Sequence, residues 1–243
     1  GGYAEARTQI ERGLELAQAA SAHRLETEGL LLLGQVNLYE PDYAQAREHL
    51  QRALRLCREH GDRQTQANAL DLLGVCAQQQ GDYEAARDAY EQSLRLSREI
   101  GNRGDEVATL LRLGMVASDR DDYRTAQGYF GRCLRMAREF GDRWSQATVF
   151  NCLGVIAAET GDLTGAVDYF EQYLQLARET GHRRHSGLAL MNLGETEVDR
   201  GEYVKGRAYL EQALQTFLEI GERRLEGVTR HGIGLLALRL GDY

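Results

Sequence analysis

The chain has 243 residues, a net charge of −8 and an isoelectric point near 5.4. A nucleic-acid surface needs clustered Lys and Arg that carboxylates do not compensate, so this composition argues against nucleic-acid binding by this region. No apolar run reaches the roughly 18 residues of a membrane helix, and the start Gly1-Gly2-Tyr3 lacks the features of a signal peptide. We therefore expect no membrane association and a cytoplasmic location, and the Arg-rich, Lys-poor composition favours a bacterial source.

The sequence repeats itself every forty residues. Tyrosine marks six of the seven places on this grid, and Leu163 occupies the other: Tyr3, Tyr43, Tyr83, Tyr123, Tyr203 and Tyr243. A fixed period of this length indicates stacked structural repeats rather than one globular core. The sequence therefore predicts a single elongated array in which each unit contacts mainly its neighbours.

Each repeat is predicted to contain two helices. In residues 81–120, one set of apolar side chains at helical spacing begins at Tyr83 and a second begins at Val107. The breaks between the sets carry Gly followed in most copies by Asp or Asn, which suit the end of one helix and the cap of the next. We expect twelve helices, at about Tyr3 to Ala20, Arg24 to Tyr39 and then at forty-residue intervals.

The first predicted helix corresponds to the second helix of a repeat. The expected organisation is a half-repeat at 1–20, five helix pairs at 24–60, 64–100, 104–140, 144–180 and 184–220, and a half-repeat at 224–240. The last three residues, Gly241-Asp242-Tyr243, repeat Gly81-Asp82-Tyr83, which opens a second helix, and neither end carries a polar cap. Because a solenoid needs such caps, we expect a piece of a longer array, with any effector domain outside it.

A glycine recurs in the middle of every first helix, although a mid-helix glycine costs about 1 kcal/mol relative to alanine. This column consists of Gly34, Gly74, Gly114, Gly154, Gly194 and Gly234. Its repetition predicts a close helix approach, in which a side chain of the partner helix lies over the bare backbone. The small residues of the facing helix would be Ala46, Ala86, Ala126 and Ala166.

These columns resemble the tetratricopeptide repeat. One unit shows the pattern from Leu73-Gly74 through Gly81-Asp82-Tyr83 to Ala86, Tyr90 and Ser93, and the resemblance covers the whole chain. The family's basic unit has about 34 residues. The longer unit is similar to that of bacterial regulators with a signalling ATPase module of the maltose-activator type, and of spindle-orientation scaffolds. The resemblance implies an all-α fold, a right-handed α-α superhelix of about twelve antiparallel helices.

The resemblance also implies a concave wall, formed by the first helices, that binds an extended or helical peptide. Carried over by position, the wall residues are Asp71, Val75, Gln78, Arg112, Met115, Asn151, Val155, Met191, Asn192 and Glu195. The wall columns vary between repeats while the packing columns do not, as expected if each step presents a different side chain to a ligand. Amide and charged groups would bind a ligand backbone, and apolar patches would supply desolvation.

No residue pattern predicts catalysis, a cofactor or a metal. The four cysteines show no C-x-x-C spacing and are expected to be packed thiols. His182 and His185 are three residues apart, but no third ligand follows them. The acidic pair Asp105-Glu106 falls at a helix start, where negative charge is favourable. We therefore predict a non-enzymatic protein.

The leading hypothesis is a protein-interaction scaffold that forms the sensor or partner-binding region of a larger bacterial signalling or transcription regulator. Two alternatives stay open at this point. One is a small-molecule inducer receptor that uses the same groove, and the other is a structural array that associates with itself through its uncapped ends.

Overall fold

The computed structural model describes the backbone of residues 2–241 and the side chains of residues 4–241. The predicted opening of a further repeat at Asp242 and Tyr243, and the side chain of Tyr3, lie outside the described residues. Residues 2–241 contain helices and no strand, which confirms the all-α class. The helices are α1 (Gly2–Ala19), α2 (His23–Tyr39), α3 (Tyr43–His60), α4 (Arg63–Gln79), α5 (Tyr83–Ile100), α6 (Arg103–Ser118), α7 (Tyr123–Glu139), α8 (Arg143–Glu159), α9 (Leu163–Glu179), α10 (Arg183–Asp199), α11 (Tyr203–Ile220) and α12 (Arg223–Leu240).

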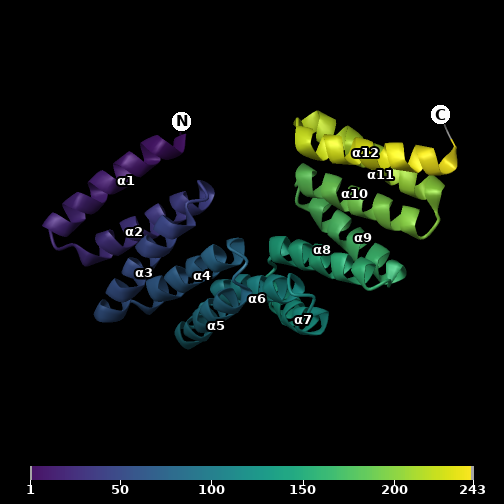
Figure 1. Ribbon diagram of the computed structural model, residues 1–243. Helices are drawn as coiled ribbons and strands as arrows, with labels where there is room; N and C mark the ends of the chain where they lie inside the picture. Colours follow the sequence, from purple (N-terminus) through teal and green to yellow (C-terminus); the bar gives the residue numbers. More distant parts are fainter. Residues whose placement is uncertain (1, 242–243) are drawn as a thin grey trace. The chain divides into compact units, whose positions relative to one another are not determined.

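The chain divides into two compact units, Gly1–Tyr129 and Phe130–Tyr243, with the boundary inside α7. Within each unit, consecutive helices form antiparallel neighbours (Figure 1). We call the even-numbered helices A helices and the odd-numbered helices B helices. Neighbouring A helices also contact each other, as α2 does with α4 and α10 with α12.

The breaks between helices have the chemistry that the sequence predicts. Gly101 ends α5 in the left-handed conformation, with φ of 74°, which glycine adopts without a steric penalty. The Asn102 side chain then accepts a hydrogen bond of 3.1 Å from the Asp105 N–H and caps α6. In the later copies His182, Glu202 and Glu222 stand at the capping place without a side-chain cap bond. These side chains are longer than the Asp and Asn that reach the backbone elsewhere.

The glycine column lies under large side chains of the following B helix. A Cβ added to Gly74 would lie 2.6 Å from Cδ1 of Tyr90, and one on Gly154 would lie 2.5 Å from Cε1 of Phe170. Leu50 covers Gly34 and Leu210 covers Gly194 in the same way. Real Cβ atoms do not approach other atoms this closely, so at these four positions the B helix can pack against the A helix only because the A helix has no side chain there.

The small residues of the B helices lie in the same contact. Ala46, Ala86, Ala126 and Ala166 have no exposed surface. In α11 the corresponding residue is Gly206, and a Cβ there would lie 2.9 Å from the Gly194 carbonyl oxygen. The Gly234 position differs, because a Cβ added there would meet no neighbouring atom within 4 Å. No helix follows α12 among the described residues.

A buried polar residue near the start of several A helices joins them to the preceding B helix. In α6 this residue is Glu106, which is 3% exposed and lies 3.5 Å from Arg98 and 3.2 Å from Arg103. In α8 the corresponding Gln146 donates a hydrogen bond of 3.0 Å to the Ala137 carbonyl oxygen. Pairing of this kind offsets the cost of burying a polar group.

The contact at Gly74 yields a first prediction. Gly74→Ala should destabilise the protein by about 1–3 kcal/mol, because the new methyl group meets the Tyr90 ring in a packed interior. Gly128→Ala is the matched control, since Gly128 also lies inside a helix but a Cβ added there would meet no neighbouring atom within 4 Å. That change should raise stability by about 1 kcal/mol through helix propensity. Urea unfolding followed by circular dichroism measures both, and equal effects of the two changes would contradict the packing account.

The buried thiols yield a second prediction. Cys57 and Cys133 are almost wholly buried, and burial raises the pKa of the Cys57 thiol to about 11 and that of Cys133 to about 12. The reactive thiolate is therefore scarce near neutral pH. Both thiols should react with a disulfide reagent at about pH 8 only as fast as the protein unfolds, and rapidly in denaturant. Peptide mapping after timed labelling identifies each cysteine, and rapid labelling of either one in the native protein would refute the prediction.

Candidate functional site

The predicted wall residues lie on A helices and form one set in each unit. In the first unit α4 and α6 carry Asp71, Val75, Gln78, Arg112 and Met115. In the second unit α8 and α10 carry Asn151, Val155, Met191, Asn192 and Glu195. Each set lies within one unit and has its own contacts.

An ion pair forms the centre of the first set. Arg112 Nε lies 3.0 Å from Asp71 Oδ1, and the two side chains are 39% and 21% exposed. Burial raises the pKa of the Asp71 carboxyl, and the charge of Arg112 partly opposes this shift. The two facing atoms are buried and have no hydrogen-bond partner, so they attract each other without the directed geometry of a hydrogen bond.

This pair is the middle step of a series between α4 and α6. Toward the start of the helices, Gln64 donates a hydrogen bond of 2.6 Å to Asp105. Toward their end, Gln78 donates a bond of 2.7 Å to Asp119. Each pair joins residues 41 positions apart, and successive pairs lie about two helical turns apart. We call these three pairs, Gln64–Asp105, Asp71–Arg112 and Gln78–Asp119, the polar ladder.

The polar ladder is tied to the glycine contact. The Tyr90 hydroxyl, at the far end of the ring that covers Gly74, donates a hydrogen bond of 3.2 Å to Gln78. Burial raises the pKa of this hydroxyl, so it stays protonated and remains a donor. One side chain therefore packs the helix pair and also orients a wall residue.

A small cavity adjoins the Asp71–Arg112 pair. Its volume is about 260 Å³, and both members of the pair line it together with Leu31 and Gln35 of α2. Val75 is half-buried farther along α4, and Met115 on α6 is 39% exposed. The first set thus combines charged groups, amides and exposed apolar surface.

The second set repeats the same spacing with amides. Asn192 donates a hydrogen bond of 2.9 Å to Asn151, again 41 positions away. Val155 is 37% exposed. Glu195 is exposed, yet desolvation and the nearby charge of Asp199 raise the pKa of its carboxyl.

Met191, another predicted wall residue, also contacts the core. It is half-buried and packs against the hydrophobic core of the second unit. The local packing therefore differs among the fifth positions of the A helices, since Asp71 at that position pairs with Arg112. Sequence reasoning also missed Gln64, Asp105 and Asp119, and the separation of 41 residues is the signal that could have revealed these partners.

The described residues show no group of three or more His, Cys, Asp or Glu side chains that could hold a metal ion. None of the helices within residues 2–241 combines the length and the apolar character needed to cross a membrane. The first set offers charged and amide groups, and the second set offers amides and the Glu195 carboxyl, all of which can form hydrogen bonds.

Sequence comparison assigns the chain to a family. The tetratricopeptide repeat model matches residues 26–99 and 105–179, which is more than half of the chain. The chain belongs to the tetratricopeptide repeat family. The family and the repeat fold inferred from the Leu-Gly and Gly-Asp-Tyr columns are thereby confirmed.

Several solved structures are similar to this chain. BtubC from P. vanneervenii is 20% identical with a TM-score of 0.80, over 91% of this chain and 93% of that one. A signal transduction ATPase with numerous domains and a tetratricopeptide repeat sensor, from Pyrococcus horikoshii, is 15% identical with a TM-score of 0.78, over 98% of this chain and 38% of that one. The Rap conjugation gene regulator of the plasmid pLS20, in complex with the Phr* peptide, is 13% identical with a TM-score of 0.70, over 88% and 59%. At these identities the likeness concerns the fold, and no curated protein matches the sequence.

The ion pair yields a third prediction. Arg112→Gln should lower stability near neutral pH by about 1–3 kcal/mol, between the values for exposed and buried pairs, because Asp71 loses its counter-charge. The pKa of Asp71 is already raised, and the substitution raises it further. A raised carboxyl pKa means that the folded state binds the proton more tightly, so the loss shrinks as pH falls through that pKa.

Urea unfolding between about pH 7.5 and about pH 4.5 tests this dependence. The control is Arg87→Gln, which removes an exposed pair with Glu84 at 2.6 Å and should lower stability much less than Arg112→Gln, with little dependence on pH. A deficit for Arg112→Gln that stays constant over this range would contradict the role assigned to Asp71.

Proposed function

We propose that this chain is an interaction scaffold that binds a peptide or partner protein along the A-helix wall. The observation that carries the proposal is the Asp71–Arg112 pair, whose buried facing atoms lack hydrogen-bond partners beside a cavity. A buried polar atom without a partner is costly. The two facing atoms have almost no accessible surface, but the Arg112 and Asp71 side chains are 39% and 21% exposed, so their other atoms could form hydrogen bonds with a ligand beside the pair.

An extended peptide has the chemistry that the first set requires. Its backbone N–H groups would donate to the Asp71 carboxylate, and its carbonyl groups would accept from Arg112. An apolar side chain of the peptide would contact Val75 and Met115. Regular backbone contacts with side-chain pockets between them are a general mode of peptide recognition.

The second set offers a comparable surface within its own unit. The Asn151–Asn192 pair retains donors and acceptors beyond its one hydrogen bond. Val155 supplies exposed apolar area beside it. We infer that each unit contributes its own contacts to a partner.

The cavity volume favours a peptide over a small-molecule inducer. About 260 Å³ lies below the roughly 300–1,000 Å³ of most small-molecule pockets. The polar groups also continue along α4 and α6 past the cavity, as the Gln78–Asp119 bond shows. A ligand that extends along the helices would use this whole length.

We further propose that the chain is a non-enzymatic, cofactor-free region of a larger bacterial, cytoplasmic signalling or transcription regulator. In support, one structural relative carries a tetratricopeptide repeat sensor on a signal transduction ATPase, and another is a gene regulator in complex with a peptide. Self-association of the chain as a structural array is the alternative, and light scattering over a range of concentrations distinguishes it.

A charge reversal that preserves the ion pair gives the fourth prediction. Peptides selected from a random displayed library against the wild-type protein provide the probes. The double variant Asp71→Arg with Arg112→Asp should keep a pair at this place, and we expect stability within about 1 kcal/mol of wild type. The affinity for the selected peptides should fall by about tenfold or more, because each peptide group then meets the wrong charge.

Arg95→Glu on α5 is the control, since Arg95 is an exposed residue of a B helix. It changes the net charge without touching the A-helix wall and should leave the affinity within about twofold. Selected peptides that bind the charge-reversed protein as tightly as the wild type would refute the proposed wall.

A further inference from the structure

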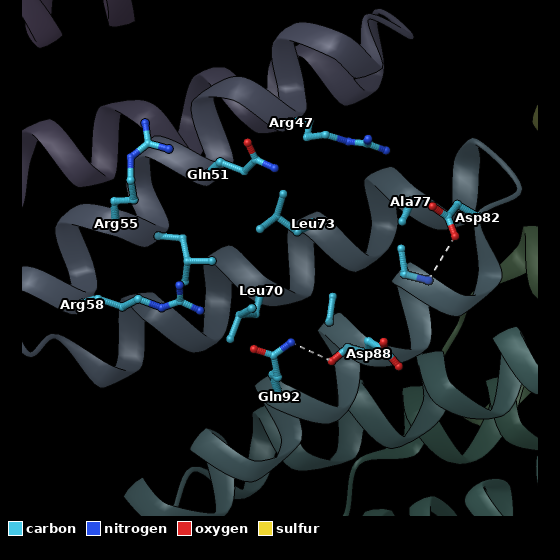
Figure 2. Close-up of a pocket in the computed structure, with 13 residues that line it drawn as sticks. Arg47, Gln51, Arg55, Arg58, Leu70, Leu73, Ala77, Asp82, Asp88 and Gln92 are labelled. Carbon is cyan, nitrogen blue, oxygen red and sulfur yellow. Dashed lines mark hydrogen bonds between the residues drawn. The ribbon is translucent and has the colours of Figure 1, made fainter.

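A second groove lies between the B helices α3 and α5, away from the A-helix wall. Its volume is about 540 Å³, and Figure 2 shows Leu70 and Leu73 of α4 between the arginines of α3 and the residues of α5. Helical periodicity places Leu70 and Leu73 on the face of α4 opposite Asp71 and Val75. The groove and the polar ladder therefore use opposite faces of the same helix.

One wall of this groove is cationic. Arg47, Arg55 and Arg58 of α3 line it, and all three are exposed. Arg47 donates a hydrogen bond to the Gln80 side chain. In the described part of the chain, Arg55 and Arg58 form neither an ion pair nor a hydrogen bond.

Comparison with the next repeat shows why Arg58 is left without a carboxylate. The corresponding Arg98 of α5 lies 3.5 Å from the buried Glu106. The residue at the place of Glu106 in α4 is Gln66. Arg98 therefore has a nearby carboxylate, whereas the corresponding Arg58 has an uncharged amide at that place.

The acidic groups across the groove are already engaged. Asp82 accepts a hydrogen bond of 3.1 Å from the Ala85 N–H and caps α5. Asp88 lies 3.3 Å from Arg87 on its own helix. Neither carboxylate compensates the charge of Arg55 or Arg58.

The corresponding groove between α9 and α11 in the second unit differs in charge. Its volume is about 490 Å³, so the two spaces are similar in size. The place of Arg55 is taken by Gln175 and that of Gln51 by Glu171, and Glu179 also lines this groove. The cationic wall is therefore absent from the α9–α11 groove. On α5, Arg87, Arg95 and Arg98 occupy the same repeat positions as the three arginines of α3. Two of these are paired with carboxylates, Arg87 with Glu84 and Arg98 with Glu106.

The two grooves also differ at one position of their second B helix. Ala89 lines the α3–α5 groove, whereas Tyr209 lines the α9–α11 groove at the corresponding place. Tyr129 and Tyr169 occupy this place in α7 and α9. Alanine leaves room above the leucine floor for the side chain of a ligand.

We propose that the α3–α5 groove binds an acidic peptide segment that carries an apolar side chain. Arg55 and Arg58 bind its carboxylates, since guanidinium groups pair well with carboxylates. The half-buried Leu73 receives the apolar side chain beside Ala89. This surface is independent of the A-helix wall, so a partner can engage the two faces separately.

Fluorescence anisotropy with defined probes tests the proposal. The probe is fluorescein-labelled Glu-Asp-Leu-Glu-Asp, and two comparison peptides are Gln-Asn-Leu-Gln-Asn and Glu-Asp-Gly-Glu-Asp. We expect the acidic leucine probe to bind at concentrations below about 1 mM, the amide peptide to bind about tenfold more weakly, and the glycine peptide about threefold more weakly. Equal binding of the leucine and glycine peptides would overturn the role of Leu73.

Two variants of the full chain place the site. Arg55→Gln combined with Arg58→Gln should weaken the acidic probe by about tenfold or more, and Ala89→Tyr should do the same by occupying the groove. Ala89→Tyr introduces a residue that other B helices carry at this place, and circular dichroism checks that both variants are folded. If neither variant weakens the probe, the proposal is wrong.

Matched controls separate this site from the A-helix wall and from general charge attraction. Arg178→Gln removes the corresponding arginine of the α9–α11 groove and should leave the affinity within about twofold. The charge-reversed variant at Asp71 and Arg112 should also leave this probe unaffected, so the two proposals can fail separately. A loss with Arg178→Gln equal to that of the α3 double variant would show non-specific attraction and would overturn the proposal.

Discussion

The structure depends on one repeated contact, in which a large side chain of α3, α5, α9 or α11 lies on a bare glycine of the preceding A helix. A methyl group at Gly74 or Gly154 would overlap the ring of Tyr90 or Phe170. The absence of that methyl group allows close packing, and dispersion contacts over the ring offset the conformational cost of glycine. Because the contact recurs, it sets the same spacing between helices in successive repeats.

The same contact has consequences for the wall that we assign to binding. Tyr90 covers Gly74 with its ring and donates its hydroxyl hydrogen to Gln78. Gln78 in turn is hydrogen-bonded to Asp119 of the next A helix. Packing energy and polar orientation therefore act through one side chain, and a loss of packing at Gly74 would also disturb the wall.

Helix α4 separates two environments that differ in their electrostatics. On one face of α4, Asp71 and Arg112 face each other with reduced exposure, so desolvation governs the pKa of Asp71. On the other face, Arg55 and Arg58 stay exposed and keep their charge in contact with solvent. Attraction at the exposed site is screened by salt, whereas interactions at the half-buried pair are screened less. A regular scaffold thus supports two kinds of recognition surface.

The sequence by itself determined the helices and their ends. Helical spacing, glycines in the left-handed conformation and Asp or Asn caps act within a few residues, so they can be read without knowledge of the fold. The glycine column also predicted close packing, since a repeated local cost requires a tertiary compensation. The positions of the wall residues on A helices followed from the family resemblance.

Only the tertiary structure decided which side chains meet. The stagger between neighbouring A helices pairs residues 41 positions apart, so Asp71 faces Arg112 rather than the residue one repeat later. It also placed Met191 against the hydrophobic core of the second unit. These outcomes depend on the offset and rotation of whole helices, which packing sets and which no local pattern of residues encodes.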